Sequence, residues 1–146
     1  MTAKTNYLEN KIIDWLFRGQ TFTPPASLYF GLLTANADDT ATLTEVSGGS
    51  YARVAVTPSL ANFAGTQGAG TTVASTGTTA TTSNNVAITY PAPTANWGSV
   101  TGVGVWDAVS GGNLLVYATL SSPKTVNNGD AAPTFAAGAF TYQDDN

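Results

Sequence analysis

The stretch TGVGVWDAVSGGNLLVYATL, residues 101–120, contains the glycine spacing with which many nucleotide-binding loops begin. Such a loop needs a third glycine and a helix that opens against the phosphates. Asp107 stands where the third glycine should be, and the Gly111-Gly112 pair that follows would break a helix. Apolar residues on both sides of this pair predict a β-hairpin instead. We therefore expect no cofactor at this motif.

Few side chains in the sequence could act as acids, bases or nucleophiles. The chain has neither histidine nor cysteine, so it lacks the commonest general base, the usual zinc ligands and any disulfide. A serine nucleophile would need a lysine as its base. The lysines that could serve are Lys4, Lys11 and Lys124.

Carboxylates are the remaining candidates, because two of them are sufficient to hydrolyse a glycosidic bond. The candidates are Asp38, Asp39, Glu45, Asp107 and Asp130. They lie in or beside turn-rich segments, where aspartate is common because it stabilises turns. The Asp38-Asp39 pair and residues 127–130 also lack the spacing of a calcium-binding loop, and residues 127–130 are better explained as a turn. We expect no catalytic residue, no metal site and no enzymatic activity.

The composition limits the classes of partner. Charged residues make up 10% of the 146 residues, five of them basic and nine acidic, against about 25% in an average soluble domain. The basic residues are scattered, which argues against nucleic acid as a partner. No apolar run is long enough to cross a membrane, and Glu9 and Asp14 interrupt the apolar stretch that a secretion signal would need. So little charge suits a protein that is packed against other subunits; a sparsely charged secreted β-protein is the alternative.

One helix is predicted, over residues 6–18, NYLENKIIDWLFR. Asn6 and Glu9 have the spacing of a capping box, and Gly19 can end the helix in a left-handed conformation. The helical period places four apolar residues on one face, which we expect to pack on the protein's own sheet. These residues are Leu8, Ile12, Trp15 and Leu16. Ile13 and Phe17 widen the apolar surface beyond that face, and we expect them to contact a partner.

The rest of the chain has the pattern of β-strands separated by turns. The predicted strands are residues 27–34, 50–57, 85–90, 100–108, 113–120 and 137–143. Short strands after one leading helix predict a mainly β protein: a single domain over residues 1–146, folded as an antiparallel β-sandwich of jelly-roll or immunoglobulin-like type with one N-terminal α-helix.

Residues 61–83 differ from the rest, because they are almost entirely Gly, Ala, Thr and Ser and carry no charge. Such a segment cannot bury enough apolar surface to fold alone. We expect either a flexible surface loop or an arm that becomes ordered against a neighbouring subunit. Gln67, Thr72 and Thr78 are the candidate partner-binding residues of this loop.

Four segments carry a resemblance to a known family. They are YLENKIIDWLFRGQTFTPPASLYFGLLT, EVSGGSYARVAV, SNNVAITYPAPTANWGSVTGVGVWDAVSGGNLLVYATL and PKTVNNGDAAPTFAAGAF. Together they resemble small virion proteins of tailed bacteriophages, which are often labelled tail fibre proteins and are similar to head decoration or cement proteins. The most specific parts are residues 45–56 and 97–120, while the stretch near 61–83 looks like an insertion.

The resemblance implies a structural protein of the virion that is made in the cytoplasm of the host bacterium. Our first expectation is a cement protein that binds the shell of major capsid protein and forms homo-oligomers in the particle, with no nucleic acid or membrane as partner. The alternative is a tail fibre or tail appendage that contacts the host surface. In that case Trp97, Trp106, Tyr117 and Tyr142 could line a carbohydrate groove, although core packing is the more ordinary role of such residues.

Overall fold

One layer of the fold is a six-stranded antiparallel sheet. The structure is a computed structural model, and it describes residues 2–144. In the large sheet the strand order is β1-β8-β7-β2-β3, and β4 also pairs with β2. Its strands are β1 (Thr2–Lys4), β2 (Leu28–Ala35), β3 (Thr44–Glu45), β4 (Val54–Val56), β7 (Gly98–Trp106) and β8 (Leu114–Val126).

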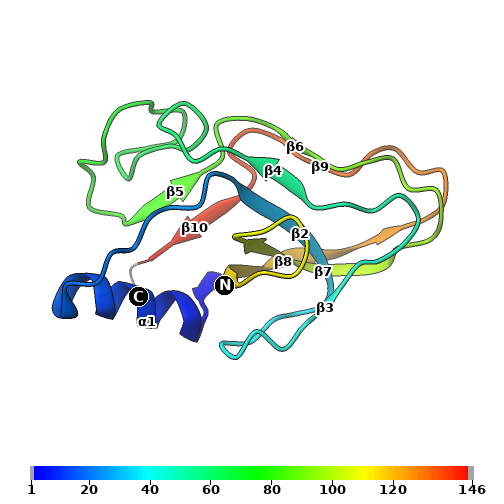
Figure 1. Cartoon of the computed structure of the whole chain (residues 1–146). Coiled ribbons are helices and arrows are strands. Elements are labelled where there is room, and N and C mark those ends of the chain that lie inside the picture. Colours follow the sequence, from blue (N-terminus) through cyan, green and yellow to red (C-terminus); the bar gives the residue numbers. More distant parts are fainter. Residues whose placement is uncertain (1, 145–146) are drawn as a thin grey trace.

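Two small antiparallel sheets provide the other layer (Figure 1). One pairs β5 (Thr81–Ser83) with β10 (Thr141–Gln143), and the other pairs β6 (Ile88–Thr89) with β9 (Thr134–Phe135). A single helix, α1 (Asn6–Arg18), follows β1 and lies at one end of the molecule. The predicted fold class, a mainly β antiparallel sandwich with one N-terminal helix, is confirmed.

The core lies between these layers and is rich in aromatic rings. Phe30 of β2 is fully buried, and its ring meets that of Phe140 edge-on at 5.1 Å between centroids. Tyr51 meets Trp97 in the same way at 5.4 Å. Offset and edge-on contacts of this kind add stability beyond the burial of area. The aromatic rings therefore fill much of the core between the two layers.

The predicted hairpin is confirmed: β7 and β8 pair from residue 98 to residue 126. Gly104 lies beside the ring of Trp106, and a Cβ atom on Gly104 would come within 2.5 Å of that ring. A glycine is therefore required for close packing rather than for phosphate binding. Strand β8 continues past the predicted end at residue 120. Pro123 is tolerated because the ladder is irregular between Val100 and Gly102, opposite this part of β8.

The predicted strand over residues 50–57 is shortened to β4, Val54–Val56. Gly48, Gly49 and Ser50 all have positive φ angles, so the chain turns there before it can pair. Apart from β8, which runs six residues past its predicted end, the other predicted strands form within four residues of their expected limits.

Helix α1 has the predicted limits but a different N-cap. Thr5 is the cap residue, and its hydroxyl donates to the backbone oxygen of Leu114 at 2.6 Å instead of capping the helix. The predicted capping role of Asn6 is therefore wrong, because the tertiary contact with β8 decides where the helix begins. Gly19 is left-handed with φ of 66°, as predicted.

The segment of residues 61–83 is held by many polar contacts. Gln67 accepts a hydrogen bond from the Thr76 amide at 3.2 Å and donates to the Ala74 carbonyl at 3.1 Å. The Thr79 hydroxyl donates to the Thr66 carbonyl at 2.8 Å. The segment ends in β5, whereas the sequence predicted either a flexible surface loop or an arm that becomes ordered against a neighbouring subunit. Side-chain amide and hydroxyl groups thus replace the apolar core that this segment lacks, and its mobility in solution stays a prediction.

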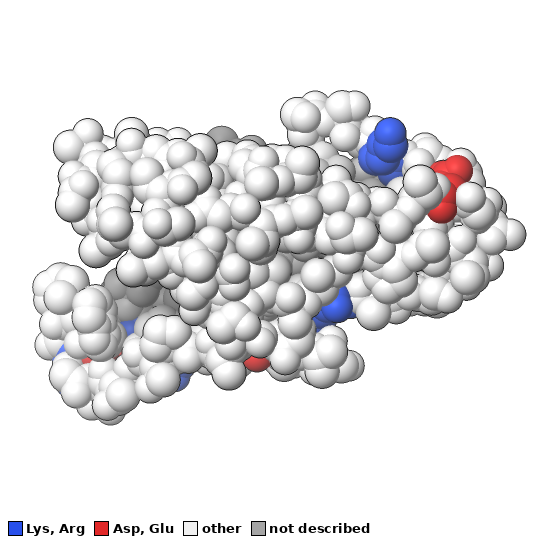
Figure 2. Space-filling model, turned by 90° about the horizontal axis from the view of Figure 1, so that it is seen from above, with Lys and Arg blue, Asp and Glu red and all other residues white. Residues whose placement is uncertain are grey.

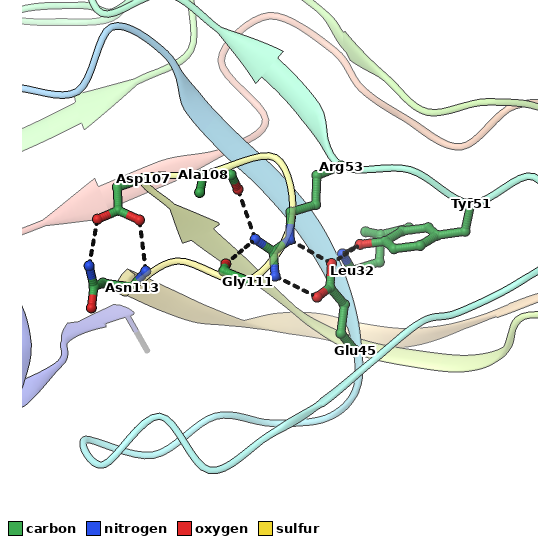
Figure 3. A network of polar contacts seen from close by, with 8 residues as sticks. All are labelled: Leu32, Glu45, Tyr51, Arg53, Asp107, Ala108, Gly111 and Asn113. Carbon is green, nitrogen blue, oxygen red and sulfur yellow. Dashed lines mark hydrogen bonds and ion pairs between the residues drawn. The ribbon is translucent and has the colours of Figure 1, made fainter.

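Arg53 connects three parts of the large sheet (Figure 3). Its guanidinium donates to both carboxylate oxygens of Glu45, at 2.9 and 2.8 Å, and to the carbonyls of Ala108 and Gly111, both at 2.8 Å. It also lies 3.9 Å from the centroid of the Trp106 ring. These contacts fix β3 and β4 to the turn between β7 and β8.

We expect Arg53→Ala to lower the free energy of unfolding by about 3 kcal/mol, because it leaves the carboxylate of Glu45 unpaired in a largely enclosed site. Arg18→Ala is the matched control. The side chain of Arg18 is 70% exposed and pairs with Asp14 on the surface of α1. We therefore expect this variant to lose less than about 1 kcal/mol of the free energy of unfolding. Urea unfolding curves measure both. Equal losses would show that Arg53 does not hold the sheet together.

We expect Gln67→Ala to make residues 65–79 about 30-fold more sensitive to thermolysin, since two hydrogen bonds of about 1 kcal/mol each are lost. The urea midpoint should hardly change because the core is untouched. Thr78→Ala, at an exposed position of the same loop, is the control. If both variants are cleaved at the same rate, the Gln67 contacts do not order the loop.

Candidate functional site

The C-terminal half of α1 exposes four large apolar side chains, which we call the helix-end patch. They are Ile13 (50% exposed), Trp15 (56%), Leu16 (59%) and Phe17 (78%). Ile13 and Phe17 face outward as predicted. The prediction that Trp15 and Leu16 pack on the protein's own sheet is wrong, because α1 contacts β8 and β1 while no residue of the helix is buried.

An apolar groove of about 260 Å³ lies beside the first half of α1. We call it the apolar groove. Leu8 of α1, Leu28 and Phe30 of β2 and Val116 of β8 contribute to its walls, with Phe63 from the loop that follows β4. Most of the lining is aliphatic or aromatic, and the polar side chains are those of Thr82 and Tyr142. The groove can therefore receive an apolar side chain, and it offers little to a charged ligand.

The hydroxyl of Tyr142 is directed to a partner of its own. It donates to a carboxylate oxygen of Asp144 at 2.7 Å, and burial together with this bond raises the pKa of Tyr142. Asp144 also pairs with Lys4 of β1, and the hydrogen bond from Lys4 lowers the pKa of Asp144. The last described residues are thus tied to the strand that precedes α1.

A second hollow, of about 290 Å³, lies under the loop of residues 61–83. It is lined by threonine, glycine, alanine and serine residues and by Gln67. The amide group of Gln67 is already engaged within the loop. Thr72 and Thr78 are exposed and lie outside the lining of this hollow. The structure therefore does not gather the three predicted loop residues into one site.

The candidate carboxylates all accept hydrogen bonds from neighbouring groups. Asp107 accepts two from Asn113, both at 2.7 Å, and Asp130 accepts one from the Asn127 amide at 2.8 Å, within the predicted turn. Asp38 accepts hydrogen bonds from Thr40 and Thr42, which lower its pKa. These contacts are those of turn-stabilising residues.

The remaining two carboxylates bind tyrosine hydroxyls. Asp39 accepts a bond of 2.7 Å from Tyr117, which raises the pKa of Tyr117 to about 12. Glu45 accepts a bond of 2.7 Å from Tyr51 as well as those from Arg53. Burial, followed by this bond to Glu45, raises the pKa of Tyr51. In the described part of the chain, no three acidic residues lie close enough together to hold a metal ion.

Of the four aromatic residues considered for a carbohydrate groove, two belong to the core. Trp97 and Trp106 are 5% and 4% exposed. The indole of Trp97 donates to the Gly49 carbonyl at 2.9 Å. Tyr117 and Tyr142 are half-buried, and Tyr142 lines the apolar groove. Core packing, the more ordinary role, is therefore the role of both tryptophans.

The surface carries few charges. Figure 2 shows one face of the molecule, on which basic and acidic side chains form small separated patches among uncharged residues. Within residues 2–144, no helix has both the length and the apolar character needed to cross a membrane.

The comparison with known proteins gives one family. No curated protein matches the chain. The model of a family described as "Podophage GP4 fiber I protein gp80" matches residues 3–143. This match confirms the resemblance to small virion proteins of tailed phages that are labelled tail fibre proteins. Since it covers nearly the whole sequence, the chain belongs to the family of the podophage GP4 fiber I protein gp80.

Proposed function

We propose that this protein is a structural subunit of a tail fibre in a podophage virion. The observation that carries the proposal is the match of residues 3–143 to a family named for a fiber protein. The match includes α1 and every strand from β2 to β10. The proposal therefore concerns the whole domain and not a short shared motif.

The surface of the protein supports a role in assembly. With five basic and nine acidic residues, few ion pairs can form across an interface, and exposed pairs contribute only about 0 to 1 kcal/mol each. The helix-end patch offers apolar side chains instead. Large exposed apolar patches on soluble proteins mark contact sites. The partners that fit are other proteins of the tail, including further copies of this chain.

We also propose that the protein is not an enzyme. The five candidate carboxylates act as hydrogen-bond acceptors in turns or in the contacts of Arg53 and Tyr117. A retaining or inverting glycosidase needs two carboxylates that face the same substrate bond. A fibre that only binds the host surface has no such requirement.

A cement protein of the capsid is the second candidate. Its support is the same scarcity of surface charge, because a protein enclosed between capsid subunits gains from apolar contact. The major capsid protein would then be the partner, and binding to the assembled shell would stabilise it. The name of the family favours the fibre over this candidate.

We expect antibodies raised against the purified domain to label the tails of intact virions in electron micrographs. Quantitative mass spectrometry should find tens of copies per particle, far fewer than those of the major capsid protein. Antibodies against the major capsid protein are the labelling control. Label over the whole head with hundreds of copies would overturn the fibre proposal in favour of the cement protein.

We expect no hydrolysis when the protein is incubated with capsular polysaccharide and lipopolysaccharide from the host. The release of reducing ends measures the reaction, and a glycosidase of known activity on each substrate is the positive control. Turnover that disappears in Glu45→Gln or Asp107→Asn, with both variants still folded by circular dichroism, would contradict the absence of enzymatic activity.

A further inference from the structure

We propose that the helix-end patch of one copy of this chain packs into the apolar groove of a second copy. The inference deepens the proposed function and rests on it, because a fibre subunit works in contact with neighbouring subunits. The patch consists of Ile13, Trp15, Leu16 and Phe17, and the groove lies between the first half of α1, β2, β8 and β10.

The apolar stripe of α1 continues beyond the body of the protein. Leu8 and Ile12 are partly buried, and Leu8 lines the groove. Trp15 and Leu16 follow on the same face at helical spacing, yet each is more than half exposed. One stripe is therefore covered at its start and uncovered at its end, which indicates that its second half is covered by something outside the subunit.

The groove has the chemistry and the size to accept a side chain of the patch. Its walls are almost wholly apolar, with Thr82 and Tyr142 as the polar contributors. An apolar cavity of about 150 Å³ is large enough to bind benzene. The groove measures about 260 Å³, so a phenyl or indole ring fits into it.

A subunit cannot fill its own groove with its own patch. Leu8 lines the groove, whereas Phe17 lies at the other end of the same rigid helix, about 14 Å farther along the helix axis. The chain thus carries both halves of an apolar contact that it cannot make within itself. The groove of a second copy can receive the patch, and the patch of a second copy can fill the groove.

Charge does not oppose the approach of two identical copies. On α1, Arg18 pairs with Asp14 at 2.7 Å, and Lys11 lies 5.6 Å from the centroid of the Tyr7 ring. Among residues 2–144, no charged side chain lines the groove. The net charge of −4 is spread over the molecule, and salt screens exposed charges beyond about 10 Å at 0.1 M.

The area available is close to what a specific contact needs. The four side chains of the patch expose on the order of 500 Å² together, by the usual areas of large apolar side chains. Stable interfaces bury about 800 Å² on each partner, so the patch alone supplies more than half of that area and the proposed interface must extend to the residues around it. Patch and groove are different surfaces, so two copies can exchange the contact reciprocally about a two-fold axis, or several copies can repeat it in one direction around a ring.

The first test measures the mass of the purified protein in solution by light scattering at about 100 µM. We expect an oligomer for the wild type, and for Trp15→Glu/Phe17→Glu a dissociation constant raised about 100-fold or more, since central aromatic residues dominate interfaces. Val109→Glu is the matched control, because Val109 is 63% exposed and lies in the turn between β7 and β8. The Val109→Glu variant should remain oligomeric.

Circular dichroism and urea unfolding show whether the double variant is folded. A monomeric wild type, or a folded double variant that keeps the mass of the wild type, overturns the proposal. If the double variant unfolds, the single variant Phe17→Glu decides in its place, because Phe17 is 78% exposed and its replacement removes no contact of the core.

The second test uses the absence of native cysteines. Phe17→Cys and Thr82→Cys are purified separately, mixed and mildly oxidised, with Val109→Cys as the control for random oxidation. A disulfide-linked dimer that forms in the mixture, and not with either variant alone, supports the seating of Phe17 in the groove. If Phe17→Cys cross-links to itself as well, the helices meet each other and the groove assignment is wrong.

The two proposals can fail separately. A protein that is monomeric in solution but labels virion tails would leave the fibre role intact and exclude this contact between copies, in favour of another tail protein on the patch. An oligomer that depends on Trp15 and Phe17 but is found on the capsid would retain the contact and overturn the fibre role.

Discussion

The contact on which the large sheet depends is that of the Arg53 guanidinium with Glu45 and the ring of Trp106. The Arg53 side chain is only 8% exposed, so its charge must be fully paired inside the fold. Beside this contact the backbone of β2 has no room for a side chain at residue 31. A Cβ atom on Gly31 would lie 2.7 Å from both Glu45 and Trp106, so a glycine is required there. Tyr51 completes the group by donating to Glu45 while it accepts the Leu32 amide at 2.8 Å. One buried cation thereby joins β2, β3, β4 and the β7–β8 turn.

Local features of the fold could be predicted from the sequence, because they follow from local rules. The helical period of α1, its end at the left-handed Gly19 and the β7–β8 hairpin depend on residues that are close in sequence. The N-cap and the strand at residues 50–57 were predicted incorrectly, since Thr5 bonds to β8 and Ser50 takes a left-handed conformation. Both outcomes involve distant segments, because Thr5 contacts Leu114 and the hydroxyl of Ser50 lies 2.8 Å from that of Thr94. The split of the second layer into two short sheets also depends on such contacts and has no local signal.

The candidate site could be predicted in part. Helical spacing identifies which residues share a face, so Ile13 and Phe17 were expected outside. Spacing does not reveal where the supporting sheet ends, and for that reason Trp15 and Leu16 were expected inside. The apolar groove was not predicted, because its walls come from α1, β2, β8 and β10 and are assembled only by the fold. The one available signal was an apolar surface too wide for a helix packed on one sheet.

The distribution of charge explains why the surface is suited to apolar contacts. The carboxylate of Glu45 is neutralised within the subunit by Arg53, while Asp39 stays on the surface and accepts a hydrogen bond from Tyr117. The exposed ion pair on α1 is local and contributes little. Attraction between subunits must then come from surface that the monomer leaves uncovered. A helix that extends past its own sheet provides such surface at small cost to the core, since none of its residues is buried. The stability of the subunit and its capacity for assembly are thus carried by different parts of the chain.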